Sequence, residues 1–288
     1  MHLKTQATLV GLIGHHIEAS LAPEIHMGEG YRQGLRYAYR LLDLSVLGVS
    51  IDELDTFLCL TSKVGFDGLA VTHPFKQSVV PLMDELSDEA DALCAVNTIV
   101  FQDGRRVGHN TDWYGFYEAF GVHLPNVDRE RVVQLGAGGA GGAVAYAGIR
   151  RGIKELVLFD LDVERASRVA AELMKTSGIA KVRVGLDLEA EIANASGLIN
   201  ASPVGMASLP GSPVPEKFLR PDLWVADIIY FPWETQLLNR ARGLGAHTMN
   251  GGTMAVYQAA KQFLLFTGRE PGIPEMLDRL QLLSAQRA

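Results

Sequence analysis

The sequence predicts an α/β fold made of two α/β domains, the first with a mainly parallel sheet and the second of the dinucleotide-binding type. Three features of the 288 residues lead to this prediction. Apolar runs of β character alternate with helical patterns, as in parallel sheets with right-handed crossovers. The alternation stops near residue 112 and then starts again. A cluster of glycines follows the first strand of the second series, where a nucleotide-binding turn is expected.

The first series begins with a short apolar run and ends in a hairpin. Its first five elements alternate between strand and helix, at residues 7–14, 20–34, 35–44, 51–62 and 65–73. Residues 78–94 then carry many acidic side chains, and we expect one helix with a solvated acidic face. Two β-like runs flank Asp103-Gly104, a dipeptide that favours a tight hairpin turn. The Asn-Thr-Asp run at 110–112 leads from this hairpin into an aromatic helix start.

The second series alternates in the same way. Strands are expected at 132–135, 155–160, 181–186, 197–206 and 224–230. Helices are expected up to residue 151 and at 163–178, 189–195, 235–245 and 251–268, before a weakly patterned tail at 274–283. Residues 132–149 lack any charge, which is the pattern of a membrane helix, but their glycines favour a strand-to-helix turn instead. The sequence does not indicate which domain the last helices pack on.

The composition is that of an ordinary globular protein, with 48% hydrophobic and 20% charged residues. The net charge of -7 gives no basic surface for nucleic acid or anionic membrane. Cys59 and Cys94 fit no metal-binding spacing and no disulfide framework. We therefore expect two buried thiols, a reducing compartment and no metal site. The N-terminal apolar run has no cleavage site behind it, so we interpret it as a first strand and expect a cytoplasmic protein.

Gly136, Gly138 and Gly141 form the pattern G-x-G-x-x-G, directly after one predicted strand and before a predicted helix. In this context glycines permit the turn and let the backbone approach a pyrophosphate. The helix N-terminus supplies donors and a positive dipole end for the same group. A turn required only for packing the helix on the strand is the alternative interpretation.

Asp160 ends the next strand, about 20 residues further on, where an acidic residue would bind the adenine ribose hydroxyls. A carboxylate at this position repels a 2′-phosphate, and Arg165 lies only a helical turn further along the chain. These features favour NAD over NADP as the cofactor. The alternative role for Asp160 is that of a helix N-cap.

Lys76 and Asp112 are the candidates for proton transfer. Lys76 follows the apolar strand that ends at Thr72, just past the sheet edge where ligands of parallel α/β sheets bind. A partly desolvated lysine there can act as an acid or base, although a lone lysine is more often a surface residue. Asp112 lies at the presumed domain boundary. A Lys-Asp pair can hold a hydroxyl group and exchange its proton while hydride leaves the carbon.

Taken together, the motifs resemble those of the shikimate dehydrogenases and their quinate/shikimate dehydrogenase relatives. The matching segments are GLIG, SLAPEIH, VTHPFKQ, AVNTIV, GHNTD, GAGGAGGAVAYA, NASPVGM, DIIYFPWETQLL and GGTMAVYQAA. They occur in the family's order and spacing and cover nearly the whole chain. The resemblance implies a substrate-binding and catalytic domain at 1–112 plus 251–288, and a Rossmann NAD-binding domain at 113–250.

The resemblance also implies roles for individual residues. Lys76 and Asp112 match the family's catalytic pair. The positions that match substrate-binding groups are Ser20, Thr72, Asn97, Tyr230 and Gln258. The positions that match the cofactor-binding segments are Gly136, Ala137, Gly138, Gly139, Ala140, Gly141, Asp160, Asn200, Ser202, Pro203 and Met206. Two alternatives stay open, namely that Asn97 only satisfies turn backbone and that Tyr230 only fills the core.

One turn departs from the family pattern. Two hydroxyl residues usually grip the substrate carboxylate, but here Ser20 is followed by Ala22, and Ser20 alone equally fits a helix N-cap. A lost charge-assisted hydrogen bond costs about 1.5 to 3 kcal/mol, which lowers the affinity expected for shikimate itself. His16 stands where the turn usually has proline, so His15, His16 or Glu18 are candidates for recognising a modified ring, such as an amino-substituted one.

The expected function is that of an oxidoreductase that transfers a hydride between NAD(P) and the ring hydroxyl of shikimate, quinate or a close analogue. Two alternatives stay open: an enzyme of the methylenetetrahydrofolate dehydrogenase type, and a module that binds shikimate-like acids without turnover. The expected partner is a small cyclic hydroxy acid, with neither nucleic acid nor membrane. The oligomeric state is left open, with a homodimer as one option.

Overall fold

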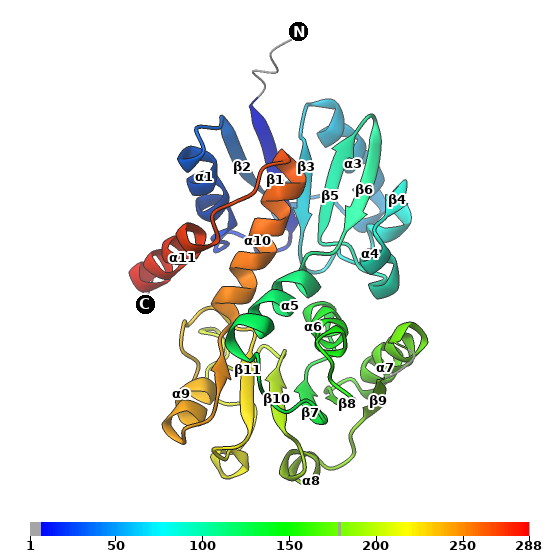
Figure 1. The fold of residues 1–288 in the computed structure, drawn as a ribbon. Helices are drawn as coiled ribbons and strands as arrows, with labels where there is room; N and C mark the ends of the chain where they lie inside the picture. Colours follow the sequence, from blue (N-terminus) through cyan, green and yellow to red (C-terminus); the bar gives the residue numbers. More distant parts are fainter. Residues whose placement is uncertain (1–6, 178–179, 288) are drawn as a thin grey trace. The chain divides into compact units, whose positions relative to one another are not determined.

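The computed structural model describes residues 7–177 and 180–287 and divides into two compact units (Figure 1). Unit 1 extends to Thr111 and also includes Ala259–Leu280. Unit 2 comprises Asp112–Gln258 and the chain from Gln281. Residues 1–6, 178–179 and 288 fall within the predicted domains, and Gly178 ends a predicted helix, but these positions lie outside the described residues.

The sheet of unit 1 has six strands in the order β2-β1-β3-β5-β6-β4. The strands are β1 (Thr8–Gly14), β2 (Tyr37–Asp43), β3 (Gly68–Val71), β4 (Glu85–Leu86), β5 (Thr98–Gln102) and β6 (Arg105–His109). Three strand pairs are parallel, whereas β5 is antiparallel to both of its neighbours. The sheet is mainly parallel, as predicted. The predicted hairpin joins β5 to β6, and Asp103 and Gly104 have the positive φ values, 52° and 77°, that such a tight turn requires.

Helices cover both faces of this sheet (Figure 1). The helices of unit 1 are α1 (Ala22–Arg32), α2 (Leu44–Leu47), η1 (Ile51–Glu53), α3 (Leu54–Lys63), η2 (Val80–Leu82), α4 (Asp88–Leu93), the C-terminal part of α10 (Gly251–Thr267), and α11 (Ile273–Arg287) as far as Leu280. Side chains of β3 alternate between two cores, because successive residues of a strand point to opposite faces. Leu69 packs in a cluster with Leu54 and Leu58 of α3, whereas Ala70 packs with Phe266 of α10. The strand that leads to Thr72 is therefore fixed from both sides.

Residues 78–94 do not form the single helix that the sequence predicted. They contain η2, β4 and α4 in succession. Pro81 cannot donate a backbone hydrogen bond in a helix interior, and it lies at the start of η2 instead. The backbone N–H groups of Asp84 and Ser87 donate to the carbonyls of Arg106 and Gly108, each at 2.9 Å, so this segment joins the edge of the sheet. Ser87 then caps α4 through a hydrogen bond from the Ala90 N–H.

The two thiols are less buried than the sequence suggested. Cys59 is partly buried and Cys94 is exposed. Cys94 is the C-cap residue of α4, with a φ of 46°, so a helix end rather than a core-facing position sets the direction of its side chain. The expectation of two buried thiols is therefore wrong.

The sheet of unit 2 also has six strands, in the order β12-β11-β10-β7-β8-β9, and all of its pairs are parallel. The strands are β7 (Arg131–Leu135), β8 (Glu155–Phe159), β9 (Lys181–Val184), β10 (Gly197–Asn200), β11 (Trp224–Asp227) and β12 (Thr248–Met249). Strand β12 has only two residues and was not predicted. This order is that of the doubly wound nucleotide-binding fold, in which ligands bind outside the carboxyl ends of the strands.

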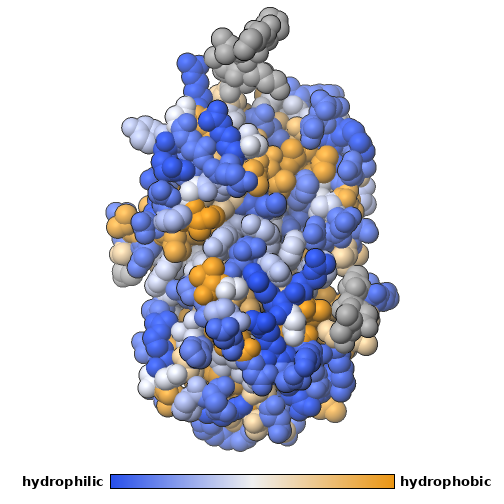
Figure 2. Space-filling model, in the orientation of Figure 1, coloured by the Kyte–Doolittle hydropathy of each residue, from blue (hydrophilic) through white to orange (hydrophobic). Residues whose placement is uncertain are grey.

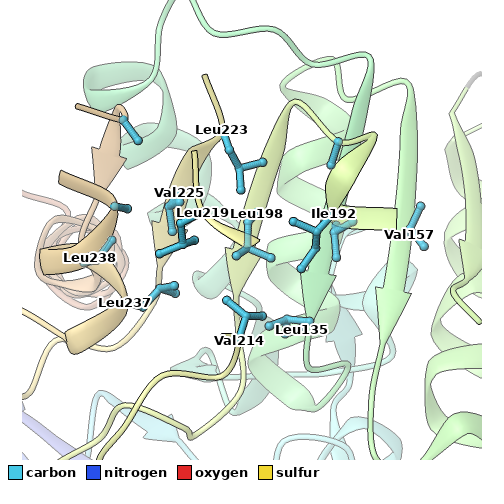
Figure 3. Packing of buried hydrophobic residues seen from close by; sticks show 14 residues of the cluster. Leu135, Val157, Ile192, Leu198, Val214, Leu219, Leu223, Val225, Leu237 and Leu238 are labelled. Atoms are coloured by element: carbon cyan, nitrogen blue, oxygen red, sulfur yellow. The ribbon is translucent and has the colours of Figure 1, made fainter. Parts of the chain in front are cut away.

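The helices of unit 2 enclose this sheet. They are α5 (Asp112–His123), α6 (Gly139–Arg150), α7 (Val163–Ser177), α8 (Leu188–Ala193), η3 (Glu216–Phe218), α9 (Gln236–Gly243) and the N-terminal part of α10. Figure 3 shows one core cluster, in which Leu198 and Val225 of the sheet lie with Ile192 of α8 and Leu237 and Leu238 of α9. These five side chains are at most 1% exposed, so the ends of β10 and β11 are held on a close-packed base.

The uncharged residues 132–149 form most of β7 and α6, joined by the glycine turn. Among the helices of the described chain, none combines the length and apolarity that a membrane span needs. The face in view in Figure 2 is mainly hydrophilic, with small separate groups of hydrophobic residues.

Candidate active site

The glycine turn after β7 has the geometry expected of a nucleotide-binding turn. Gly136 has a φ of 94°, and a Cβ atom there would lie 2.5 Å from the carbonyl oxygen of Ala201. A Cβ atom on Gly141 would collide with the carbonyl oxygen of Gly136, whereas one on Gly138 would have nothing within 4 Å. Close backbone packing thus requires the first and third glycines. Gly138, the N-cap of α6, leaves its backbone open to a ligand, and α6 begins with Gly139 and Ala140.

Gln134 braces this turn from below, a feature that the sequence reasoning missed. Its side chain is fully buried in the middle of the sheet. The Nε2 atom donates to the carbonyl oxygen of Gly136 at 2.9 Å and to that of Gly141 at 2.8 Å. One amide group therefore joins the first and third glycines of the turn. A glutamine inside an otherwise apolar strand, just before the glycines, was the available signal.

Asp160, directly after β8, connects the turn to the next strand. Its Oδ2 accepts a hydrogen bond from the Ala137 N–H at 2.7 Å, and its Oδ1 accepts one from the Asp162 N–H at 2.9 Å. The guanidinium of Arg165 binds the same carboxylate. Burial raises the pKa of Asp160, but these hydrogen bonds, led by Arg165, outweigh it and hold the pKa below its usual value. Asp162, rather than Asp160, accepts from a backbone N–H within α7, that of Arg165.

The segment Asn200 to Met206 forms a compact loop at the end of β10. Asn200 is fully buried, and its Oδ1 accepts hydrogen bonds from Ser202 N at 3.1 Å and Ser202 Oγ at 2.6 Å. Its Nδ2 donates to the Val204 carbonyl at 3.0 Å. Pro203 lies within this turn and accepts from the Met206 N–H, while Met206 is 42% exposed. The side chains of Asn200 and Ser202 therefore shape the loop, and its exposed residues are Pro203 and Met206.

In unit 1, three predicted residues lie at one edge of the sheet. Because β5 runs antiparallel to β3, its beginning lies beside the end of β3, and the Val71 N–H donates to the Asn97 carbonyl at 2.8 Å. Thr72 follows β3, and the turn after it leads through the buried Phe75 to Lys76. Both Thr72 and Lys76 are partly buried. The Lys76 carbonyl accepts from the Val96 N–H at 2.8 Å, which fixes the backbone of the lysine.

Asn97 belongs to a buried polar cluster at the same edge. Its Oδ1 accepts hydrogen bonds from the Thr111 N–H at 2.7 Å and from Thr98 Oγ1 at 2.8 Å. Its Nδ2 donates to Thr111 Oγ1 at 3.0 Å. Gln262 of α10 donates to Thr98 Oγ1 at 2.9 Å and to the Asn97 carbonyl at 3.2 Å. Asn97 thus satisfies turn backbone next to Asp112. Thr98, Thr111 and Gln262 were not predicted.

Ser20 lies in the turn between β1 and α1. Its Oγ accepts from the Ala22 N–H at 3.3 Å, so it forms a local turn at the start of α1, while the N-cap residue is Leu21. Asp43, at the end of β2, holds the same turn through the Ile17 N–H at 3.0 Å. Hydrogen bonds, first from the Ser45 hydroxyl and then from backbone N–H groups including that of Ile17, lower the pKa of Asp43 to about 2. His16 in this turn has a φ of 53°.

Asp112 begins α5 and is buried, 4% exposed. Gly115, one turn later, packs against α10, because a Cβ atom there would lie 2.5 Å from the Met254 carbonyl and 3.1 Å from Cβ of Gln258. Asp112 and Gln258 are thus on adjacent helices of unit 2. Tyr230 is 40% exposed after the end of β11, so the alternative that it fills the core is wrong.

The predicted residues are divided between the units. Lys76, Thr72, Asn97 and Ser20 belong to unit 1, whereas Asp112, Gln258, Tyr230 and the predicted nucleotide-binding residues belong to unit 2. The pairing of Lys76 with Asp112 joins residues of different units and stays a prediction. Within the described part of the chain, no group of three or more His, Cys, Asp or Glu residues is arranged to hold a metal ion.

Comparison with known proteins connects this arrangement to characterised sequences. A family model described as the shikimate dehydrogenase substrate binding domain matches residues 12–99. The shikimate dehydrogenase (NADP(+)) of Streptomyces avermitilis is 47% identical over 282 residues, which is 97% of this chain and 97% of that protein. The quinate/shikimate dehydrogenase (NAD(+)) of Corynebacterium glutamicum is 44% identical over 272 residues, which is 93% of this chain and 96% of that protein.

Solved structures show the same similarity. The quinate dehydrogenase from Corynebacterium glutamicum in complex with NAD has a TM-score of 0.91 and 42% identity, covering 96% of this chain and 99% of that one. The shikimate 5-dehydrogenase from Thermus thermophilus in complex with NADP(H) and shikimate has a TM-score of 0.82 and 29% identity, covering 96% and 99%. Both the NAD-linked and the NADP-linked proteins thus match nearly the whole chain.

Proposed function

The chain belongs to the shikimate dehydrogenase family, and on this basis we propose that it transfers a hydride between NAD and the ring hydroxyl of shikimate, quinate or a close analogue. It is an NAD(P)-dependent dehydrogenase. The observation that carries the proposal is similarity to such dehydrogenases over 97% of the chain, combined with an intact nucleotide turn and an intact Lys76 and Asp112. The relatives give no support to a folate-type enzyme or to a binding module without turnover.

We propose that the hydroxy acid binds mainly to residues of unit 1 and that the dinucleotide binds to unit 2. Gly138 and the N-terminus of α6 would hold the pyrophosphate, since the backbone there is accessible to a ligand. The N–H groups of the first helical turn can donate to the phosphates, and the positive end of the helix dipole favours their charge. The bound nicotinamide would supply the hydride acceptor. The remaining contacts to the dinucleotide would come from Asp160 and from the loop at 200–206.

Residues of the chain itself would transfer the proton of the ring hydroxyl. Lys76 would hold the ring hydroxyl and exchange its proton as the carbon–hydrogen bond breaks, while Asp112 would orient both groups. Thr72, Ser20, Asn97, Tyr230 and Gln258 would bind the other hydroxyl groups and the carboxylate of the acid.

We further propose a preference for NAD over NADP. Asp160 is ionised at neutral pH, because its pKa lies below the usual value, and a negative charge beside the ribose repels a 2′-phosphate. Arg165 does not cancel this preference, since its one guanidinium is paired with two carboxylates, those of Asp160 and Asp162. We also propose that the protein acts in the cytoplasm and assembles as a homodimer.

A steady-state comparison tests the proposal. Shikimate, quinate and an amino analogue are each supplied with NAD or NADP, and NADH or NADPH formation is followed at about 340 nm. We expect turnover with at least one acid and a higher kcat/KM with NAD. Lys76→Ala should lower kcat by about 10² to 10⁴-fold, the usual contribution of a positioned acid or base.

The matched control is Lys63→Ala, which removes an exposed lysine at the end of α3 in the same unit. It should leave kcat within twofold of the wild-type value. Absence of turnover with every acid would defeat the substrate proposal. A Lys76→Ala enzyme as active as Lys63→Ala would defeat the role of Lys76.

A further inference from the structure

Asp227, the last residue of β11, is a fully buried carboxylate, and its hydrogen-bond donors among the described residues include no basic side chain. It accepts hydrogen bonds from Asn200 Nδ2 at 3.1 Å, from the Ile229 N–H at 3.1 Å and from Thr235 Oγ1 at 2.8 Å. These donors come from three segments that are separate in the chain. Burial of a carboxylate is energetically unfavourable unless hydrogen-bond donors surround it, and at Asp227 three donors do so.

The first donor connects Asp227 to the loop at 200–206. The Asn200 amide that donates to Asp227 also donates to the Val204 carbonyl, and its oxygen accepts from Ser202. Ser202 Oγ in turn accepts from the Val204 N–H at 3.3 Å. The orientation of the Asn200 side chain is therefore fixed by Asp227 on one side and determines the shape of the loop on the other.

The other two donors connect Asp227 to the segment that carries Tyr230. The Ile229 N–H, immediately before Tyr230, is bound to Oδ1, and Thr235, the N-cap of α9, is bound to Oδ2. Both ends of the segment 229–235 are thus held by a single carboxylate. Thr235 also accepts from the Leu238 N–H at 3.3 Å, so the base of this segment is continuous with α9.

We propose that Asp227 is a positioning residue that aligns the nucleotide loop at 200–206 with the Tyr230 segment, so that one buried group sets both sides of the site in unit 2. The inference rests on the proposed function, which gives the loop and Tyr230 their ligands. An ionised carboxylate is suited to this task because it only accepts hydrogen bonds, and three donors converge on it. An amide at the same position has only one acceptor oxygen, so the donors bound to the other carboxylate oxygen would lose their acceptor.

Asp227→Asn tests this role directly. We expect the Kd for NAD, measured by calorimetry, to rise by about tenfold, which corresponds to about 1.4 kcal/mol. The KM for the hydroxy acid should rise by a similar factor, because the Tyr230 segment loses the same anchor. A lowered melting temperature with both constants within twofold of wild type would overturn the proposal, since it would leave only a structural role.

Substitutions of Thr235 test the connection to the Tyr230 segment separately from the connection to the loop at 200–206. They also provide a test if Asp227→Asn does not fold. Thr235→Val removes the link to the Tyr230 segment together with the cap of α9, but it leaves the link between Asp227 and Asn200 intact. We therefore expect a higher KM for the hydroxy acid and an NAD Kd within twofold of wild type. Thr235→Ser keeps the hydroxyl and should restore the KM. Equal changes of both constants in Thr235→Val, or no recovery in Thr235→Ser, would overturn the proposal.

The NAD measurement also distinguishes this inference from the proposed function. Calorimetric binding of NAD needs no turnover, so a wild-type protein that binds NAD but oxidises none of the acids would defeat the substrate proposal alone. In that case Asp227→Asn should still weaken NAD binding by about tenfold. Unchanged NAD binding in a folded Asp227→Asn protein would defeat the inference whatever the outcome for turnover.

Discussion

Units 1 and 2 each present candidate ligand-binding groups at the end of a six-stranded sheet, but they do so by different means. In unit 1 the groups are side chains, such as those of Thr72 and Lys76, that follow a strand packed on both faces. In unit 2 the groups are largely backbone, presented by the glycine turn and the loop at 200–206. A side chain can be replaced without moving the chain, whereas backbone has to be held in place by something else.

The supports in unit 2 are buried polar side chains. Gln134 binds two carbonyls of the glycine turn, and Asn200 and Asp227 shape the neighbouring loop. These three side chains are fully buried, and each bonds groups from more than one segment or from both ends of a turn. The contrast implies that substitutions in unit 2 can impair ligand binding without removing any group that touches the ligand.

The largest expected effect comes from Gly141→Ala. The new methyl group would collide with the Gly136 carbonyl, which Gln134 holds from the other side. We expect the free energy of unfolding to fall by about 3 kcal/mol, the upper range for overpacking, and NAD binding to be lost. Urea unfolding and calorimetric titration with NAD would measure the two effects.

The adjacent Gly142 provides the matched control. A Cβ atom there meets nothing within 4 Å, and alanine in a helix interior is favoured over glycine by about 0.5 to 1 kcal/mol. Gly142→Ala should therefore be at least as stable as wild type. If Gly141→Ala were as stable as Gly142→Ala and bound NAD normally, close backbone packing would not determine the shape of the glycine turn. The difference drawn here between unit 1 and unit 2 would then be wrong.

The sequence predicted most of the framework because its signals are local. Alternating apolar runs located ten of the twelve strands in the described part of the chain. The hairpin at Asp103-Gly104 follows from two residues that tolerate positive φ. The segment 78–94 failed because its outcome is decided by hydrogen bonds to Arg106 and Gly108, which lie on another strand. Its acidic pattern fits a helix equally well until that partner strand is known.

Candidate site residues can be predicted from the sequence where the residue type itself carries the chemistry. Glycines, a lysine after a strand and a carboxylate at a unit boundary can all be found in a sequence. Gln134 and Asp227 could not be found in this way, because their importance lies in which carbonyl or N–H groups the fold brings to them. Asn97 was found, but its bonds to Thr111 required the pairing of β5 with β6.

One buried group in each unit makes the free energy of unfolding depend on pH, and the two dependences have opposite directions. Burial lowers the pKa of His26 in unit 1 to about 3, against a smaller opposing effect of Gln262. Between pH 3 and 6.5 the folded state therefore binds fewer protons than the unfolded state, and this stability is lost as the pH falls. From pH 7 to 5, His26 should cost about 2 kcal/mol of unfolding free energy.

Asp227 in unit 2 acts in the opposite direction. Burial raises its pKa to about 6, despite hydrogen bonds from Ile229, Thr235 and Asn200, so its contribution to stability is present below pH 3.8 and is lost as the pH rises through 6.

His26→Phe should remove the loss of unfolding free energy that His26 causes in unit 1 between pH 7 and 5. The difference from wild type is read from urea midpoints at the two pH values. Tyr37→Phe keeps the histidine and should retain the wild-type slope. Identical slopes in all three proteins would exclude a neutral, buried His26.

The smallest effects are expected from substitutions of two buried glutamines, one in each unit. Gln134→Leu in unit 2 frees the carbonyls of Gly136 and Gly141, so we expect the Kd for NAD to rise by about tenfold. Gln262→Leu in unit 1 instead frees Thr98 and the Asn97 carbonyl. It should raise the KM for the hydroxy acid and leave the Kd for NAD within twofold of wild type.

Both substitutions replace a buried amide by an apolar side chain, so a general loss of stability would affect the two proteins alike. The separation of the two constants is what the comparison requires, because each glutamine braces a different kind of ligand group. Backbone at the glycine turn depends on Gln134, and the side-chain cluster at Asn97 depends on Gln262. If Gln262→Leu weakened NAD binding as much as Gln134→Leu, the division of binding between the units would have to be abandoned.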